Sequence, residues 1–276
     1  MPFTNTVARK HGAHARAPID RRAPQCGVRS GLAWLWLVAL ALPVSAAEVK
    51  VLTAGAFKPV VSALAPIFEQ RTGHKLSIEN DTAGGLARRI EGGEAFDLLV
   101  VTPAVIEQLA KSGKVAAAVP TRLARVAIGV AVKQGAPRPD ISSVAAFKQA
   151  VLDAKSVAYI DPAAGGSSGI YLSKLFETMG IAAQIKPKAV LVPGGLVAQR
   201  LLTGEADLAI HQISEILAVP GAVLVGPIPA EVQNYTVYAG ALSATPRDGA
   251  AAQALLALLA STEARAVLEA KGMQAP

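Results

Sequence analysis

The fold is decided by residues 75–101, which read Lys75-Leu-Ser-Ile-Glu-Asn-Asp-Thr-Ala-Gly-Gly-Leu-Ala-Arg-Arg-Ile-Glu-Gly-Gly-Glu-Ala-Phe-Asp-Leu-Leu-Val-Val101. Residues 75–79 are typical of a strand, and a glycine-rich turn leads from them into a helix over residues 86–91. Residues 96–101 are apolar except for Asp97, as expected of a buried strand. This order of strand, helix and buried strand predicts a parallel sheet with helices packed on it.

The same order of elements extends in both directions along the chain. We expect a strand at residues 48–53, followed by a helix at 58–70, and a helix at 103–111. A second block of strands and helices runs from a central strand at 125–133 through strands at 156–160 and 189–192 to a strand at 207–211. Its expected helices cover residues 144–153, 170–179 and 196–203. Strands at 223–225 and 234–239 and two helices at 250–259 and 262–271 complete the chain. The pattern predicts an α/β protein with two lobes, each a mostly parallel sheet flanked by helices.

The predicted domains follow from this division. Residues 47–127 plus 237–276 form lobe 1, residues 128–236 form lobe 2, and two crossings near residues 126–130 and 235–238 join them as a two-segment hinge. Residues 1–46 are predicted to be a cleaved signal peptide, because a basic segment precedes a 12-residue apolar run, Gly31–Leu42, and a small-residue cleavage site near Ala46. The run is shorter than the roughly 20 residues that span a bilayer. Export to the periplasm is therefore expected.

Composition excludes several classes of protein. The 276 residues are 52% hydrophobic and contain one cysteine, which excludes a disordered chain and a disulfide-stabilised scaffold. The net charge of +7 is concentrated at the N-terminus. Six of the 27 Lys and Arg and one of the 20 Asp and Glu lie in residues 1–46, so the rest carries only +2. No nucleic-acid partner is expected.

The chain lacks an evident catalytic motif. After residue 46 it contains no cysteine and two histidines, His74 and His211. His74 is expected in a solvated loop, whereas His211 ends a strand and can face a cleft. No clustered metal ligands are present, and Gly165-Gly-Ser-Ser-Gly169 lacks the context of a nucleophile elbow. These observations predict that the protein is not an enzyme and needs no cofactor or metal.

Five strand ends run into turns of small residues, and these turns are the expected site. They are residues 53–56, 82–85, 165–168, 193–195 and 211–214. Ligands of parallel sheets bind at the carboxyl ends of the strands, where helix N-termini present free N–H groups and a positive dipole end. Small residues allow those N–H groups to approach an anion closely. The turns therefore predict an anion-binding cleft between the lobes.

Several segments resemble the periplasmic molybdate-binding proteins of ABC transporters, which are type II solute-binding proteins. Leu86-Ala-Arg-Arg-Ile followed by Phe96-Asp-Leu is similar to a segment of that family, as are Asp161-Pro162 with Gly169-Ile-Tyr171 and Gly204-Glu-Ala-Asp-Leu-Ala-Ile210. The resemblance covers residues 47–276. It implies a two-lobed fold that closes on an oxyanion.

The resemblance also implies which residues bind the ligand. The predicted ligand-binding residues are Gly55, Ala56, Thr82, Ala83, Gly84, Ser167, Ser168, Gly194, Gly195 and Gln212. The family's two ligand serines fall on Ala56 and on Ala83 or Gly84, and its tyrosine falls on Gln212. Side-chain donors are thus replaced, so that either Thr82, Ser167, Ser168 and Gln212 supply new ones or the ligand differs. Asp81, close to these turns, is expected to cap the following helix.

Taken together, these observations predict a periplasmic solute-binding protein of an ABC transporter. It is expected to be a monomer that captures a small anion similar to molybdate or tungstate and delivers it to a membrane permease. Two alternatives stay open. The same fold can bind a small organic anion such as a carboxylate, or the protein can be an exported ligand sensor that is not coupled to transport.

Overall fold

The computed structural model describes residues 48–116 and 119–276, so the predicted signal peptide lies outside the described residues. Strands and helices alternate along most of this part of the chain. The strands are β1 (Glu48–Ala54), β2 (Lys75–Asp81), β3 (Leu98–Val101), β4 (Thr121–Lys133), β5 (Val157–Ile160), β6 (Ala189–Val192), β7 (Leu208–Gln212), β8 (Ala222–Pro227), β9 (Tyr235–Leu242) and β10 (Met273–Gln274). The α-helices are α1 (Lys58–Thr72), α2 (Ala83–Glu91), α3 (Pro103–Lys111), α4 (Val144–Asp153), α5 (Ser167–Thr178), α6 (Ala182–Ile185), α7 (Gln199–Leu202), α8 (Ile213–Ile216), α9 (Gly249–Leu259) and α10 (Thr262–Ala270).

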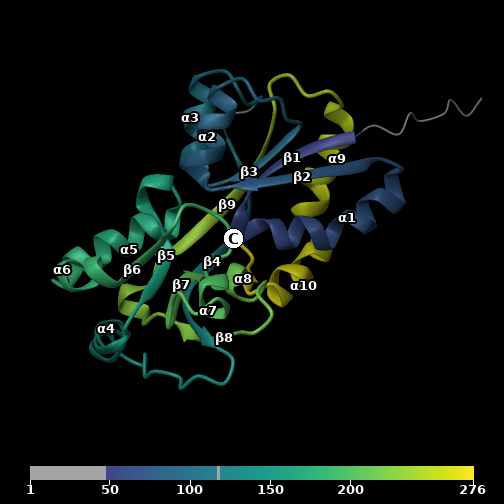
Figure 1. Cartoon of the computed structure of the whole chain (residues 1–276). Coiled ribbons are helices and arrows are strands. Elements are labelled where there is room, and N and C mark those ends of the chain that lie inside the picture. The colour runs from purple at the N-terminus through teal and green to yellow at the C-terminus, as the bar shows by residue number, and fades with distance from the viewer. Residues whose placement is uncertain (1–47, 117–118) are drawn as a thin grey trace, which may run out of the picture. The chain divides into compact units, whose positions relative to one another are not determined.

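The strands form two parallel blocks joined by two antiparallel strands. Their order is β2-β1-β3-β9-β4-β7-β5-β6, with β8 and β10 paired to β4. β1 is parallel to β2 and β3, and β5 is parallel to β6 and β7, whereas β4 and β9 pair antiparallel with each other. β4 and β9 run between the two blocks in Figure 1. The predicted α/β class and its two mostly parallel sheets are confirmed.

The buried side chains follow the same division. One cluster draws on residues 49–126 and 238–273, and two others draw on residues 128–228. The change occurs between Val126 and Ile128, within β4. The lobe boundaries, and the lobes as separate moving domains, stay predictions.

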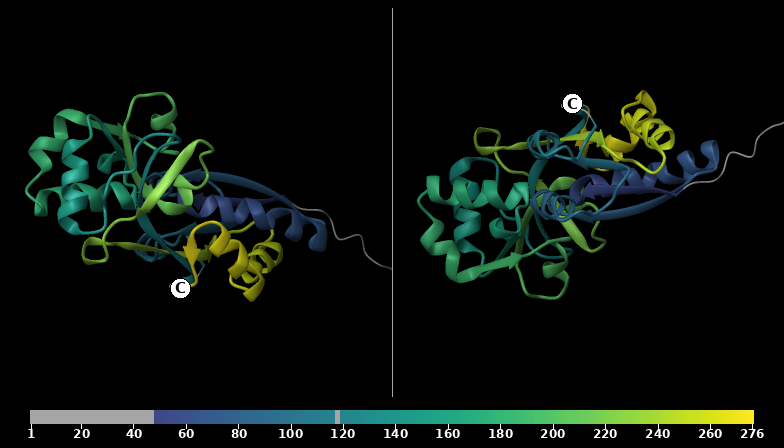
Figure 2. Two further views of the ribbon diagram at one scale, coloured as in Figure 1. Left: turned by 90° about the horizontal axis from the view of Figure 1, so that it is seen from below. Right: turned by 90° about the horizontal axis from the view of Figure 1, so that it is seen from above.

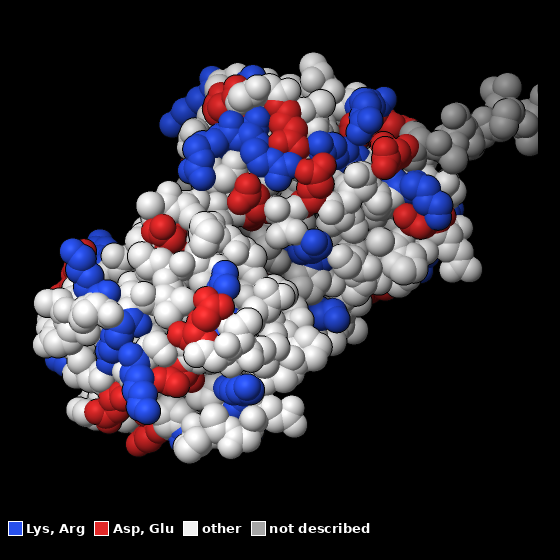
Figure 3. Space-filling model, in the orientation of Figure 1, with Lys and Arg blue, Asp and Glu red and all other residues white. Residues whose placement is uncertain are grey.

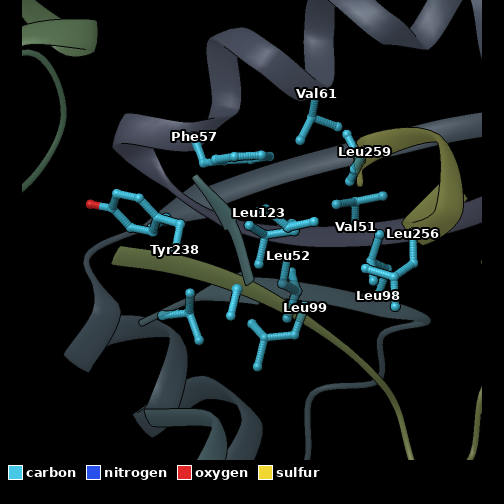
Figure 4. Close-up of a cluster of buried hydrophobic side chains, with 14 of the residues drawn as sticks. Val51, Leu52, Phe57, Val61, Leu98, Leu99, Leu123, Tyr238, Leu256 and Leu259 are labelled. Atoms are coloured by element: carbon cyan, nitrogen blue, oxygen red, sulfur yellow. The ribbon is translucent and has the colours of Figure 1, made fainter. Parts of the chain in front are cut away.

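The first cluster is built mainly of aliphatic side chains. Leu52, Leu98 and Leu99 of the central strands are fully buried there, and helices α1 and α9 cover them (Figure 4). Truncating such a side chain to alanine costs about 2–5 kcal/mol of stability. Tyr238 lies at the edge of the cluster, 6.2 Å from Phe57 between ring centroids, and its hydroxyl oxygen points away from the other labelled side chains (Figure 4).

The C-terminal helices complete this cluster. α9 and α10 pack beside α1, as both views of Figure 2 show. Among the described residues no single helix is long and apolar enough to cross a membrane, although α9 and α10 pass as a bent pair by length and composition alone.

Acidic and basic side chains interleave over the face drawn in Figure 3. One such group surrounds Arg89, which forms ion pairs with Glu79 and Glu94, and Lys50 Nζ lies 2.8 Å from Glu94 Oε1. The pairing holds the pKa of Glu94 at about 2. These contacts connect β1, β2 and the loop before β3 and have no part in the cavity described below.

Several predicted elements differ from the structure at their starts. α2 begins at Ala83 and α5 at Ser167, three residues before the predicted starts. The glycine-rich turns thus form the first helical turns, which is possible because N–H groups there need no partner within the helix. The predicted helix at 196–203 is wrong in length. Only Gln199–Leu202 is α-helical. The carbonyl groups of residues 196–198 instead accept hydrogen bonds from the N–H groups three residues later, such as the bond from Gln199 N to Leu196 O.

His74 also differs from its prediction. It is 9% exposed, and its ring stacks on Phe68 with the ring centroids 6.3 Å apart. The expectation of a solvated loop residue is wrong because the residue before β2 packs against the inner face of α1.

Candidate functional site

A cavity of about 30 Å³ lies where the five predicted turns meet. Its volume is enough for one or two water molecules. The residues that line it share small size or buried polar groups, and most come from the starts of helices. They are Ala54, Gly55, Ala56, Asn80, Asp81, Thr82, Ala83, Ile160, Gly166, Ser167, Ser168, Gly195, His211, Gln212, Glu215 and Tyr238.

Eight of the ten predicted ligand-binding residues line this cavity. The exceptions are Gly84 and Gly194. Gly84 packs against Gly165, so that a Cβ at Gly84 would lie 2.9 Å from the Gly165 Cα atom. A Cβ at Gly194 would meet nothing within 4 Å. Whether the eight residues bind a ligand stays a prediction, but the convergence of the five turns is a property of the fold.

Direct contacts join the turns from opposite sides of the cavity. Gly84 N donates to Gly165 O at 3.0 Å, and the Thr82 hydroxyl donates to Ala164 O at 2.6 Å. These bonds connect the start of α2 with the loop before α5. On another side, the Ser214 hydroxyl donates to Ala56 O at 2.8 Å. Hydrogen bonds therefore connect residues 56–84 with residues 164–214 around the cavity.

The start of α2 owes its shape to three residues. Thr82 is the N-cap, and its hydroxyl accepts a hydrogen bond from Gly85 N at 2.9 Å. The predicted capping role of Asp81 is wrong, because its carboxylate instead accepts from the adjacent Thr82 N at 2.7 Å. This carboxylate occupies the space beside Gly85, where a Cβ would lie 2.4 Å from Asp81 Oδ1. Glycine at position 85 thus permits the turn.

The start of α5 differs in having no cap. Its N-cap residue is Gly166, and no side chain among the described residues accepts a hydrogen bond as a cap there. α5 has 12 residues and begins with Ser167 and Ser168, both in the cavity wall. Its N-terminus therefore presents N–H groups and a positive dipole end to the cavity.

Glu215 is the most unusual residue of the site. It lies in α8, its side chain is only 8% exposed, and its Oε2 atom is 3.2 Å from His211 Nε2. Burial raises the pKa of Glu215 from 4.5 to about 8 and lowers the pKa of His211 from 6.5 to about 3. At neutral pH both groups are therefore mainly uncharged, which fits a carboxylic acid that donates to the imidazole. Gly55 makes room for it, since a Cβ there would lie 2.5 Å from Glu215 Oε1.

Three polar groups besides the Glu215 carboxyl face the same region. Gln212 donates through Nε2 to Thr236 Oγ1 at 2.8 Å, but its Oε1 atom is buried without a hydrogen-bond partner among the described residues. His211 Nδ1 is likewise buried without a partner in that part of the chain. The Tyr238 hydroxyl hydrogen-bonds the Ser167 side chain, and burial, together with Glu215, raises the pKa of Tyr238. Buried polar atoms without a partner, here Gln212 Oε1 and His211 Nδ1, are costly in a packed interior, so these two atoms mark a polar site.

Sequence reasoning placed His211 at a cleft correctly but missed Glu215, Tyr238 and Asn80. The spacing of His211 and Glu215 was no signal, because His211 ends β7 and Glu215 lies in the helix that follows, so the two do not share one helix face. Tyr238 gave no signal in an apolar strand. Among the described residues no group of three or more His, Cys, Asp or Glu side chains is placed to hold a metal ion.

Comparison with known proteins defines the class. Residues 49–274 match the family of bacterial extracellular solute-binding proteins, and the chain belongs to this family. The periplasmic molybdate-binding protein of Azotobacter vinelandii has the same fold, with a TM-score of 0.71 and 19% identity over 83% of this chain and 100% of that chain. The predicted resemblance and the two-lobed fold are confirmed.

Two relatives are more informative about function. An aconitate isomerase of Pseudomonas sp. is 38% identical over 230 residues, which is 81% of this chain and 86% of the relative. A molybdate-binding protein of Azotobacter vinelandii is 26% identical over 84% of this chain and 92% of the relative. The first finding overturns the prediction that the protein is not an enzyme, because a relative at this identity over most of the chain is an enzyme.

Proposed function

We propose that this protein is an isomerase that interconverts cis- and trans-aconitate, or a closely similar unsaturated tricarboxylate, by proton transfer. The observation that carries the proposal is the buried carboxyl group of Glu215 in a cavity surrounded by helix N-termini. The relation to an aconitate isomerase supports the substrate. The predicted signal peptide and the periplasmic relative support export of the protein.

The chemistry requires one group that takes and returns a proton. Aconitate carries a methylene group next to its double bond. In the proposed step, the ionised Glu215 carboxylate removes a methylene proton, and the electron pair of the C–H bond spreads over the three-carbon unit and its carboxylates. Return of the proton to the former vinyl carbon shifts the double bond and regenerates aconitate. The new double bond can have the opposite geometry, so the two isomers interconvert without any co-reactant.

The surroundings of Glu215 suit this step. A carbon acid is weak, and a carboxylate whose pKa is raised to about 8 is a stronger base than an ordinary glutamate. The developing negative charge on the substrate needs hydrogen-bond donors that are already in place. The N–H groups at the start of α5, with the hydroxyl group of Ser167, provide such donors. His211 can share the proton of Glu215 when the substrate binds.

The pH dependence follows from the same group. Glu215 must be ionised to act as the base, and its pKa lies at about 8. We therefore expect kcat/KM to rise with pH through neutrality and to level off above about 8.

The test is an isomerisation assay with the purified protein and cis-aconitate. We expect saturable conversion to trans-aconitate, and a loss of about 10²–10⁴-fold in kcat for Glu215→Gln, the range typical of a lost general base. Lys111→Gln, at the end of α3 and outside the cavity, serves as the control and should retain activity. Conversion by the Glu215→Gln variant at the normal rate would refute the role of Glu215.

The relation to a molybdate-binding protein supports a second candidate, capture of a small oxyanion for a membrane permease. The small volume of the cavity favours it. Ala56 and Ala83 at the positions of the ligand serines disfavour it, as does the carboxyl of Glu215. Thermal unfolding with molybdate, tungstate, sulfate and aconitate separates the two. A ligand at 100 times its Kd stabilises by about 2.7 kcal/mol, and only the oxyanion candidate predicts that stabilisation with molybdate but not aconitate.

A further inference from the structure

A second pocket of about 450 Å³ adjoins the cavity. The two share Gly55, Asn80, Gly195 and Glu215 as wall residues. The inner cavity accommodates no more than one or two water molecules, whereas pockets for small ligands typically measure about 300–1,000 Å³. A tricarboxylate whose reacting carbon lies at Glu215 must therefore extend into the second pocket, which we call the vestibule.

The vestibule contains one cationic residue among those that line it, Lys58. The Lys58 ammonium group donates to Asn80 Oδ1 at 2.8 Å, a neutral acceptor. None of the ion pairs found among the described residues includes Lys58, although Lys50, Lys75 and Arg89 all have carboxylate partners. Lys58 is exposed to solvent, so its charge is available to a ligand.

The position of Lys58 in its helix adds to this charge. It is the first residue of α1, a helix of 15 residues with no acidic residue in its first turn. A lysine there opposes the helix dipole, which costs stability, and the lysine and the dipole both attract an anion. Lys58 therefore adds a positive charge to a helix start that has no acidic residue, in the wall of a pocket that also contains Glu215. This arrangement favours the binding of a carboxylate.

We infer that Lys58 and Asn80 hold the outer carboxylate of the substrate and select a tricarboxylate over a dicarboxylate. This inference rests on the proposed function and names the part of the site that recognises substrate size. The reacting carbon lies at Glu215, which both spaces share, and the carboxylate that enters the inner cavity lies at the start of α5. The outer carboxylate lies in the vestibule. Lys58 is a positioning residue here because it touches no reacting atom.

The test compares two ligands and three variants by calorimetric titration and by kinetics. Itaconate has the carbon skeleton of aconitate without one carboxylate. We expect the wild-type protein to bind aconitate more tightly than itaconate, and Lys58→Gln to weaken aconitate binding about tenfold, as expected for one charge-assisted hydrogen bond. Binding of itaconate should change little, so the ratio of the affinities for aconitate and itaconate should fall. In kinetics, KM for aconitate should rise while kcat stays within a few-fold.

Lys58→Arg should restore most of the preference, because the charge returns. Lys111→Gln, at the end of α3 and outside both pockets, is the matched control and should leave all values unchanged. If Lys58→Gln loses the same affinity for both ligands, or loses affinity for neither, the inference is overturned. The binding arm also separates the two proposals, since a protein that binds aconitate through Lys58 without converting it refutes only the isomerase.

Discussion

At the scale of single residues, the site depends on side chains whose burial changes their chemistry. Glu215 and His211 lie 3.2 Å apart between Nε2 and Oε2 and are both almost completely buried. An ionised carboxylate in such a place would lack the solvation it has in water, so the proton stays bound to a higher pH than usual. A residue with this behaviour in a cavity is a candidate acid or base.

The same burial predicts how stability depends on pH. The folded protein keeps the Glu215 proton up to about pH 8, whereas the unfolded chain loses it near 4.5, so this group lowers stability as pH rises between those values. His211 acts in the opposite sense, with stability lost as pH falls from about 6.5 to about 3. Of these two groups, only Glu215 therefore changes the free energy of unfolding between pH 6.5 and pH 8.

We therefore expect the wild-type protein to lose about 2 kcal/mol of unfolding free energy between pH 6.5 and pH 8, at 1.36 kcal/mol for each unit. Glu215→Gln carries no titrating group there and should show a much smaller loss. Urea unfolding of both proteins at the two pH values measures the difference. An identical pH dependence in the two proteins would mean that Glu215 is ionised in the folded state.

At the scale of elements, the starts of α2 and α5 shape the cavity. The two turns meet through glycines, with Gly165 at a φ of +79° and its would-be Cβ 2.8 Å from the Gly84 Cα atom. Only a residue without a side chain permits so close an approach of backbone to backbone. Gly84 and Gly165, with the bond from Thr82 to Ala164 O, thus act as the contact that closes the cavity.

Gly84→Ala should weaken this contact without unfolding the protein. Its Cβ would lie 2.9 Å from the Gly165 Cα atom, so the turns must separate, and we expect affinity for the ligand to fall about tenfold or more. Gly194→Ala is the matched control, since its Cβ meets nothing within 4 Å, and it should bind normally. Titration of both variants with the ligand checks this, and equal affinities would show that the turns need not touch.

The elements themselves were largely predictable from the sequence. Strands such as β6 and helices such as α3 and α4 have the predicted bounds because apolar runs and helical periodicity mark them clearly. The first turns of α2 and α5 were missed because their glycines and serines resemble loops. The convergence of five turns was predicted from the parallel order of the strands. The position of Tyr238 in the cavity wall was not predicted, because it depends on how β9 crosses between the two parallel blocks.

At the scale of the whole molecule, the solute-binding fold explains why a resemblance predicted the fold more accurately than the activity. The backbone turns that converge on the cavity belong to the fold, and they are present here. The proposed chemistry depends on a single carboxyl group, Glu215, which a comparison of turns does not reveal. Partners such as a permease, the monomeric state and the cleavage of a signal peptide stay predictions.

The measurement that tests the account most directly is proton NMR of cis-aconitate with the wild-type protein and with Glu215→Gln in D₂O. We expect that the wild-type protein forms trans-aconitate and that deuterium enters its methylene and vinyl positions when the protonated Glu215 exchanges its proton with solvent before returning it to the substrate. The variant should do neither at a measurable rate. Aconitate that binds but stays unchanged and unlabelled with the wild-type protein would contradict the account and leave a binding protein in its place.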